Sequence, residues 1–206
     1  MKILKKFKLI LLFCGILSTV IYVISDSICS IVYPGYSYTS QAISELSAIG
    51  APTTHLWKAL TFLFDPLVIA FGMGVFLSSK KWTLKVTGML LALFGISGYA
   101  WRFFPMNMRG NIGSPSDTGH LVLSAITVLL LTLILAFGSG AMGKKFRVYS
   151  ILTILVMLFF GFLVGRMAPL VAANQPTPWM GIYERISVFS PMIWMTVLAI
   201  IFIKKE

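Results

Sequence analysis

Long apolar stretches alternate with short polar segments along the whole chain. A helix needs about 20 apolar residues to cross the hydrocarbon core of a bilayer, and the chain contains six such stretches. The pattern predicts an all-α membrane protein, a bundle of six antiparallel transmembrane helices that forms a single domain over residues 1–206. The predicted spans are residues 9–32, 55–78, 84–104, 118–137, 148–170 and 182–203.

Basic residues gather on the two tails and on the even-numbered loops between these spans. Cytoplasmic segments of membrane proteins are rich in Lys and Arg, so this distribution predicts a multi-pass protein of the cell membrane with both termini in the cytoplasm. Twelve of the 17 lysines and arginines fall on that side: Lys2, Lys5, Lys6, Lys8, Lys80, Lys81, Lys85, Lys144, Lys145, Arg147, Lys204 and Lys205.

The net charge of +11 is therefore a signal of topology. It favours anionic lipids of the inner leaflet as partners and argues against nucleic acid as a partner. The sequence names no protein partner, and no Gly-x-Ser-x-Gly motif or other signature of an enzyme class surrounds its serines.

The odd-numbered, outer loops are longer and carry turn signals. In the first, Tyr33-Pro34-Gly35 predicts a turn, Thr39 or Ser40 can cap a helix, and Gly50 can end it. We expect a short, two-turn interfacial helix over the bundle there. The second ends in Ser114-Pro115-Ser116-Asp117, which is typical of a helix start.

Several charged residues lie inside the outer halves of the predicted spans. Asp65 is the deepest, and a carboxylate near the bilayer midplane costs about 3 kcal/mol unless it is paired, protonated or hydrated. One interpretation is a buried ion-pair network that sets the helix register. The other is a polar cavity, open to the outside, whose arginines hold a phosphate or carboxylate. The residues concerned are Asp26, Asp65, Arg102, Arg166, Glu184 and Arg185.

The two histidines suggest a possible metal site. His55 and His120 are both predicted at outer helix ends, with Asp117 three residues before His120 and Glu45 in the loop helix. Two imidazoles and a carboxylate could bind zinc, with Glu45 as the catalytic general base. The alternative is that Asp117 caps its helix and His120 bonds to a loop carbonyl. No His-x-x-x-His spacing supports the zinc site.

Glycines in spans two and three predict close helix packing rather than a substrate path. They occur in Gly72-Met73-Gly74 and in Gly95-Ile96-Ser97-Gly98. Small residues at these positions let two helix backbones approach each other.

Part of the first outer loop resembles a known family. The segments Tyr33 to Tyr36 and Ser40 to Leu46, with Gly50-Ala51-Pro52, resemble prokaryotic six-span membrane proteins described as domain of unknown function 998. Further similar segments are Phe104-Pro105-Met106, Gly119-His120 and Glu184-Arg185. The resemblance implies a multi-pass membrane protein and no particular activity.

Three functions are compatible with these observations. The first is a membrane protein whose outward-facing polar cavity binds a lipid headgroup or a small anion. The second is a metal-dependent lipid hydrolase or transferase on the outer side. The third is a proton-coupled transporter in which Asp65 titrates and Pro66 acts as a hinge.

Overall fold

The computed structural model describes residues 2–206, and within them it is helical throughout, without a β-strand. Six helical segments are long and apolar enough to cross a membrane. The α-helices are α1 (Lys2–Val32), α2 (Thr54–Leu60), α3 (Phe64–Ser78), α4 (Trp82–Gly98), α5 (Pro115–Gly138), α6 (Lys144–Ala172) and α7 (Met180–Ile203). Short 3₁₀ helices are η1 (Ile43–Ser47), η2 (Tyr99–Arg102) and η3 (Ser139–Ala141).

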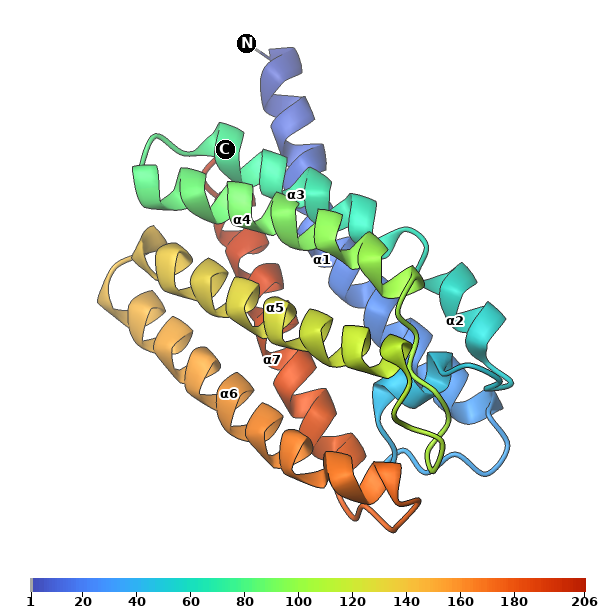
Figure 1. Ribbon diagram of the computed structural model, residues 1–206. Coiled ribbons are helices and arrows are strands. Elements are labelled where there is room, and N and C mark those ends of the chain that lie inside the picture. Colours follow the sequence, from blue (N-terminus) through green and yellow to red (C-terminus); the bar gives the residue numbers. More distant parts are fainter. Residues whose placement is uncertain (1) are drawn as a thin grey trace.

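The long helices form one bundle in which α1 packs against α3 and α7, α3 against α4, and α6 against α7 (Figure 1). The two termini lie toward the same end of this bundle, where the first turns of α1 extend beyond the other helices. The three long connections, residues 33–53, 103–114 and 173–179, gather at the opposite end, which we call the loop end. The positions of these connections matter because the candidate site lies beside them.

The second predicted span is divided into two helices. A turn over Thr61–Leu63 separates α2 from α3, although together they remain one apolar segment, Thr54–Ser78. Pro66 explains the interruption, because it has no backbone N–H to donate to the carbonyl of Phe62, four residues earlier. The turn places Asp65 in the first turn of α3 rather than in the middle of a continuous helix.

The first long connection contains a shorter helix than the two-turn helix expected. The structure has the five-residue 3₁₀ helix η1, which begins at Ile43 and not directly after Thr39 or Ser40. Side chains set this start, because the Glu45 carboxylate accepts the N–H of Ala42 at 2.9 Å and Glu184 accepts that of Ile43. Ile43 and Leu46 are buried against Cys29 of α1.

The helices α3 and α4 approach each other through glycines, as their sequence predicts. A Cβ on Gly72 would lie 2.5 Å from the carbonyl oxygen of Gly88, and a Cβ on Gly88 would lie 2.6 Å from that of Gly72. The two backbones are therefore in direct contact. This contact aligns the end of α4 with the start of α3, where Asp65 lies.

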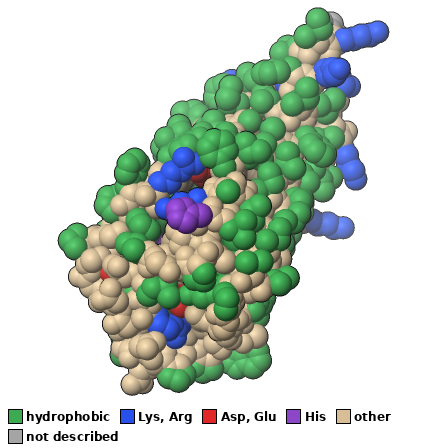
Figure 2. All heavy atoms as spheres, turned by 90° about the vertical axis from the view of Figure 1, so that its right-hand side faces the viewer, with side chains coloured by type: hydrophobic (Ala, Val, Ile, Leu, Met, Phe, Trp, Pro, Cys, Tyr) green, Lys and Arg blue, Asp and Glu red, His purple; other side chains and the backbone are tan. Residues whose placement is uncertain are grey.

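Much of the surface is apolar. Large hydrophobic side chains such as Ile10, Leu93, Leu129 and Phe159 are about half exposed or more, with exposed fractions of 57%, 48%, 59% and 58%. Figure 2 shows apolar side chains over much of the upper part of one face, with a histidine, basic groups and an acidic group clustered beside them. Exposed apolar area of this extent marks a surface that lies against another apolar phase.

Candidate binding cavity

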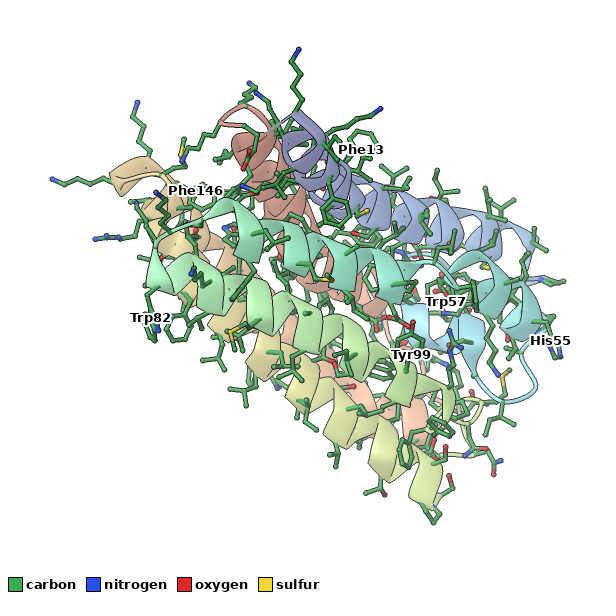
Figure 3. The ribbon with its side chains drawn as sticks, turned by 90° about the horizontal axis from the view of Figure 1, so that it is seen from above. Phe13, His55, Trp57, Trp82, Tyr99 and Phe146 are labelled. Carbon is green, nitrogen blue, oxygen red and sulfur yellow. The ribbon has the colours of Figure 1, made fainter. Side chains whose placement is uncertain are left out.

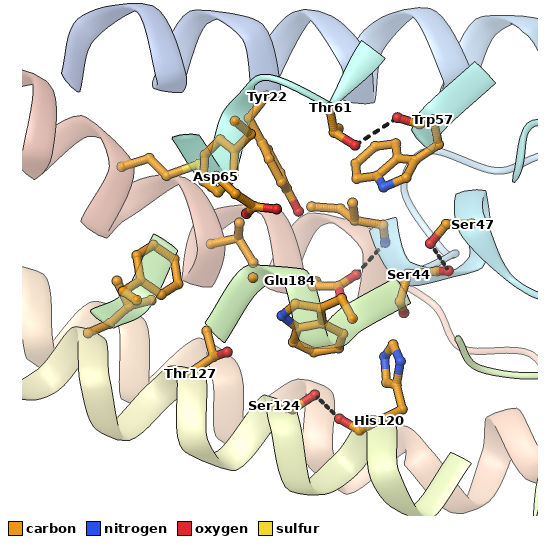
Figure 4. Close-up of a pocket in the computed structure, with 18 of the residues that line it drawn as sticks. Tyr22, Ser44, Ser47, Trp57, Thr61, Asp65, His120, Ser124, Thr127 and Glu184 are labelled. Carbon is orange, nitrogen blue, oxygen red and sulfur yellow. Dashed lines mark hydrogen bonds between the residues drawn. The ribbon is translucent and has the colours of Figure 1, made fainter. Parts of the chain in front are cut away.

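A cavity of about 730 Å³ opens among the helices toward the loop end. All the long helices contribute to its wall, together with α2, η1 and η2. Figure 4 shows that polar side chains from several of these helices point into a common space. The volume is in the range of sites that enclose a small molecule or part of a larger one.

The wall of the cavity is apolar on its inner side and polar toward the exposed side. Leu131, Met157, Met192 and Met195 line it and belong to the buried core of the bundle. Lys58 and Arg102 line it as well, but they are exposed. The cavity is therefore amphipathic, with cations at its rim.

Asp65 is the most unusual group in the cavity. Only 9% of the residue is exposed, its carboxylate points into the open space (Figure 4), and no described residue donates a hydrogen bond to it. Arg102 is close enough to act on this carboxylate electrostatically, yet no nitrogen of Arg102 comes within 4.0 Å of its oxygens. Gly98 leaves the necessary room, because a Cβ there would overlap the carboxylate.

Glu184 supplies a second carboxylate to the cavity wall. One of its oxygens accepts the backbone N–H of Ile43, drawn as a dashed line in Figure 4. That is the only hydrogen bond to this side chain within the described residues, although a carboxylate can accept about four. Glu184 thus ties η1 to α7 and keeps unused acceptor capacity.

Neutral polar groups complete the lining. His120 places Nδ1 3.1 Å from the carbonyl oxygen of Phe104 and packs its ring against Trp101 at a centroid distance of 4.7 Å. A carbonyl only accepts, so Nδ1 carries a proton, and in the neutral imidazole Nε2 is then left as an acceptor. The hydroxyls of Tyr22 and Thr127 also line the cavity, and neither has a hydrogen-bond partner among residues 2–206.

Arg185 and Asp26 form a buried ion pair beside the cavity. The guanidinium contacts both carboxylate oxygens, at 2.9 and 2.8 Å, and the two residues are 4% and 0% exposed. It also donates to the carbonyls of Tyr38 and Gly181 at 2.7 and 3.1 Å, and stacks 3.6 Å above the Tyr38 ring. The donors of Arg185 are thus directed at protein acceptors, and the pair joins α1, α7 and the first long connection.

Glu45 is held by a second ion pair, with Arg109. Nε and Nη2 of Arg109 donate to the two carboxylate oxygens, each at 3.0 Å, and other donors of Arg109 reach the Gln175 carbonyl and the Thr177 hydroxyl. Gln41 donates to Glu45 as well, at 3.1 Å. This pair links all three long connections of the loop end.

We expect Arg109→Ala to loosen the loop end. The change leaves the 4%-exposed Glu45 without its main partner, so the free energy of unfolding should fall by about 2 kcal/mol. Amide hydrogen exchange over residues 33–53 should also become faster. Lys58→Ala is the matched control, because Lys58 is an exposed cation without an ion pair among the described residues. Equal exchange in the two variants would contradict this role.

The four residues considered for zinc do not converge. Asp117 caps α5, accepting from the backbone N–H groups of Asn107, Gly113 and Ser114 and from the Asn107 amide and Ser114 hydroxyl. His55 lies at the edge of α2, away from the bundle (Figure 3), and Glu45 is engaged by Arg109. Within residues 2–206 no group of three His, Cys, Asp or Glu side chains could hold a metal ion.

The remaining ligand-binding candidates divide between the cavity and the surface. Asp65, Arg102 and Glu184 line the cavity. Arg166 is exposed on α6, outside the cavity lining, and its guanidinium lies 6.0 Å from the Phe162 ring.

Sequence reasoning missed several cavity residues and the partner of Glu45. Tyr22 and Thr127 are polar side chains in the middle of apolar spans, a signal that could have singled them out. Arg109 gave no such signal, because it lies in a loop where any charge is unremarkable. Its role depends on contacts with two segments far away in the chain.

Comparison with known proteins identifies the class to which this fold belongs. A family model described as protein of unknown function (DUF998) matches residues 16–201. The chain belongs to this family, and with its six apolar helical segments it is a multi-pass membrane protein. No curated protein and no solved structure matches the chain.

Proposed function

We propose that the protein lies in the cell membrane as a bundle of six antiparallel transmembrane helices with both termini in the cytoplasm. The basic residues at the termini and at the connections between α3 and α4 and between α5 and α6 support this orientation. The loop end is then on the extracytoplasmic side, and η1 lies near the membrane interface.

We further propose that the cavity binds a membrane lipid, with the headgroup among the polar side chains and the adjoining acyl region against the buried apolar wall. The observation that supports this proposal most directly is that one space combines the Asp65 carboxylate, which has no hydrogen-bond donor among the described residues, with a wall of Leu and Met side chains. Water alone would satisfy the polar groups but not the apolar wall. An amphiphile satisfies both.

The proposal assigns different tasks to the charged residues of the loop end. Arg102, Asp65 and Glu184 contact the ligand, because their charges face the cavity and keep unused hydrogen-bonding capacity. Arg185 and Asp26 position α7 and α1 around it. Glu45 and Arg109 hold the long connections over its rim.

A bulky side chain inside the cavity tests this proposal. Thr127 lines the cavity from α5, whereas Leu129, two residues away, is 59% exposed on the outer surface of the same helix. We expect Thr127→Trp to reduce the lipid that remains bound after purification in mild detergent by about tenfold, as measured by extraction and mass spectrometry. Leu129→Trp should retain the wild-type amount. Equal lipid content in the two variants, with equal thermal stability, would refute lipid binding in the cavity.

A further inference from the structure

The charges around the cavity are separated in a way that suggests which headgroup it accepts. Asp65 is more than nine-tenths buried and points into the cavity with no donor among the described residues. Arg102 is exposed at the rim and forms no ion pair within residues 2–206. The two side chains attract each other but leave a gap wider than a salt bridge. A ligand that bridges this gap favourably needs a positive group inside and a negative group at the rim.

From this arrangement, and resting on the proposed lipid-binding function, we propose that the cavity recognises a phosphoethanolamine headgroup. Its primary ammonium would donate to Asp65, with Glu184 and the Tyr22 hydroxyl as further acceptors. Its phosphate would contact Arg102, with Lys58 beside it at the rim. The glycerol and acyl part would continue along the apolar wall.

The acceptors inside the cavity favour a primary ammonium over a quaternary one. Asp65, Glu184 and Nε2 of His120 are all acceptors with unused capacity, and a primary ammonium supplies three N–H donors. A choline group has no N–H and is held instead by the open faces of aromatic rings. Here three aromatic rings of the cavity wall pack on one another, since Tyr22 meets Trp57 edge-on at 5.4 Å and Phe64 at 5.1 Å. They form an aromatic cluster rather than an open cage.

The cavity also disfavours purely anionic headgroups. A phosphatidylglycerol headgroup would satisfy Arg102 and Lys58 but would leave the Asp65 carboxylate buried without a counter-charge. The inner carboxylates thus select against anions, while the rim cations select against amphiphiles that carry only an amine. A buried charge that the wrong ligand leaves unpaired discriminates against that ligand in addition to the favourable contacts made by the right one.

Headgroup preference can be measured with the full-length protein in a neutral detergent. Phosphatidylethanolamine, phosphatidylcholine and phosphatidylglycerol, each carrying the same fluorophore on one acyl chain, would be titrated by fluorescence anisotropy. We expect phosphatidylethanolamine to bind about tenfold more tightly than the other two. Water-soluble glycerophosphoethanolamine should compete only weakly, because it lacks the acyl chains that cover the apolar wall.

Two variants test which residue binds each end of the headgroup. Asp65→Asn should abolish the preference for phosphatidylethanolamine over phosphatidylcholine, and Arg102→Gln should weaken the binding of all three lipids. Arg166→Gln is the matched control, since Arg166 is an exposed arginine outside the cavity, and it should bind as the wild type does.

The outcomes separate this inference from the proposed function. Equal or tighter binding of phosphatidylcholine or phosphatidylglycerol to the wild-type protein would overturn the headgroup assignment while leaving lipid binding intact. Binding of none of the three lipids would overturn both. Glycerophosphoethanolamine competing as well as the lipid would show that the site takes the soluble headgroup and not a membrane lipid. The relative affinities of the three lipids for the wild-type protein test the headgroup assignment even if a variant fails to fold.

Discussion

Replacing Arg185 with alanine should lower the free energy of unfolding by about 3–5 kcal/mol, the largest loss we expect from a single charge-removing substitution in this chain. The change leaves Asp26, which is 0% exposed, as an uncompensated carboxylate in the interior. It also removes the donors that reach Tyr38, Gly181 and Ser30. For a chain of this length the melting temperature in detergent should fall by about 10 °C.

Two control variants distinguish the effect of breaking the ion pair from the general effect of losing an arginine. Arg166→Ala removes an exposed arginine that forms no ion pair among the described residues, and it should leave the melting temperature nearly unchanged. The double variant Asp26→Leu/Arg185→Met removes both charges and should regain much of the lost stability, because no unpaired charge remains. A melting temperature that is unchanged in Arg185→Ala would contradict the structural role of the pair.

The second large effect is expected from Gly72→Ala in the contact between α3 and α4. The added methyl would lie 2.5 Å from the carbonyl oxygen of Gly88 and 2.6 Å from the backbone nitrogen of Ala92, so the helices must separate. Because backbone atoms cannot rotate away as a side chain can, we expect a loss of about 3 kcal/mol, at the upper end of overpacking effects. The cavity should also widen, because Asp65 and Gly98 lie across the same helix pair.

Gly165→Ala provides the matched control for this substitution. Gly165 is also inside a long apolar helix, but a Cβ there meets no atom within 4 Å. Alanine favours helix over glycine, so this variant should be as stable as the wild type or slightly more stable. The melting temperatures of the two variants should be measured by thermal unfolding in the same detergent. Similar melting temperatures would show that α3 and α4 can separate without cost.

Much of the fold follows from local properties of the chain. The hydropathy pattern predicted six spans, and the structure contains six apolar helical segments at the corresponding positions. The ends differ most at the start of α1, where a stretch containing four lysines continues the helix from the predicted residue 9 back to Lys2. The capped start of α5 at Pro115 was also readable, since the Ser114 and Asp117 side chains act on backbone groups a few residues away.

Only part of the candidate site could be predicted from the sequence. A charge inside an apolar span is costly wherever it points, so Asp65, Arg102 and Glu184 could be singled out from the sequence, and all three line the cavity. The residues that surround these three side chains could not be identified from the sequence. Of the three arginines that the sequence placed inside the spans, only Arg185 forms an ion pair with one of the acids placed there, Asp26, within residues 2–206.

The sequence by itself determined the number of apolar segments, the helical class and which apolar segments carry charged residues, because each depends on residues within one or two helical turns of each other. Only the tertiary structure decided that Arg185 pairs with Asp26, that Arg109 pairs with Glu45, and that Asp65 has no hydrogen-bond donor or ion-pair partner among residues 2–206. Partners of this kind come from segments up to 159 residues apart. Their choice is set by how helices pack and rotate, which is a property of all six spans together.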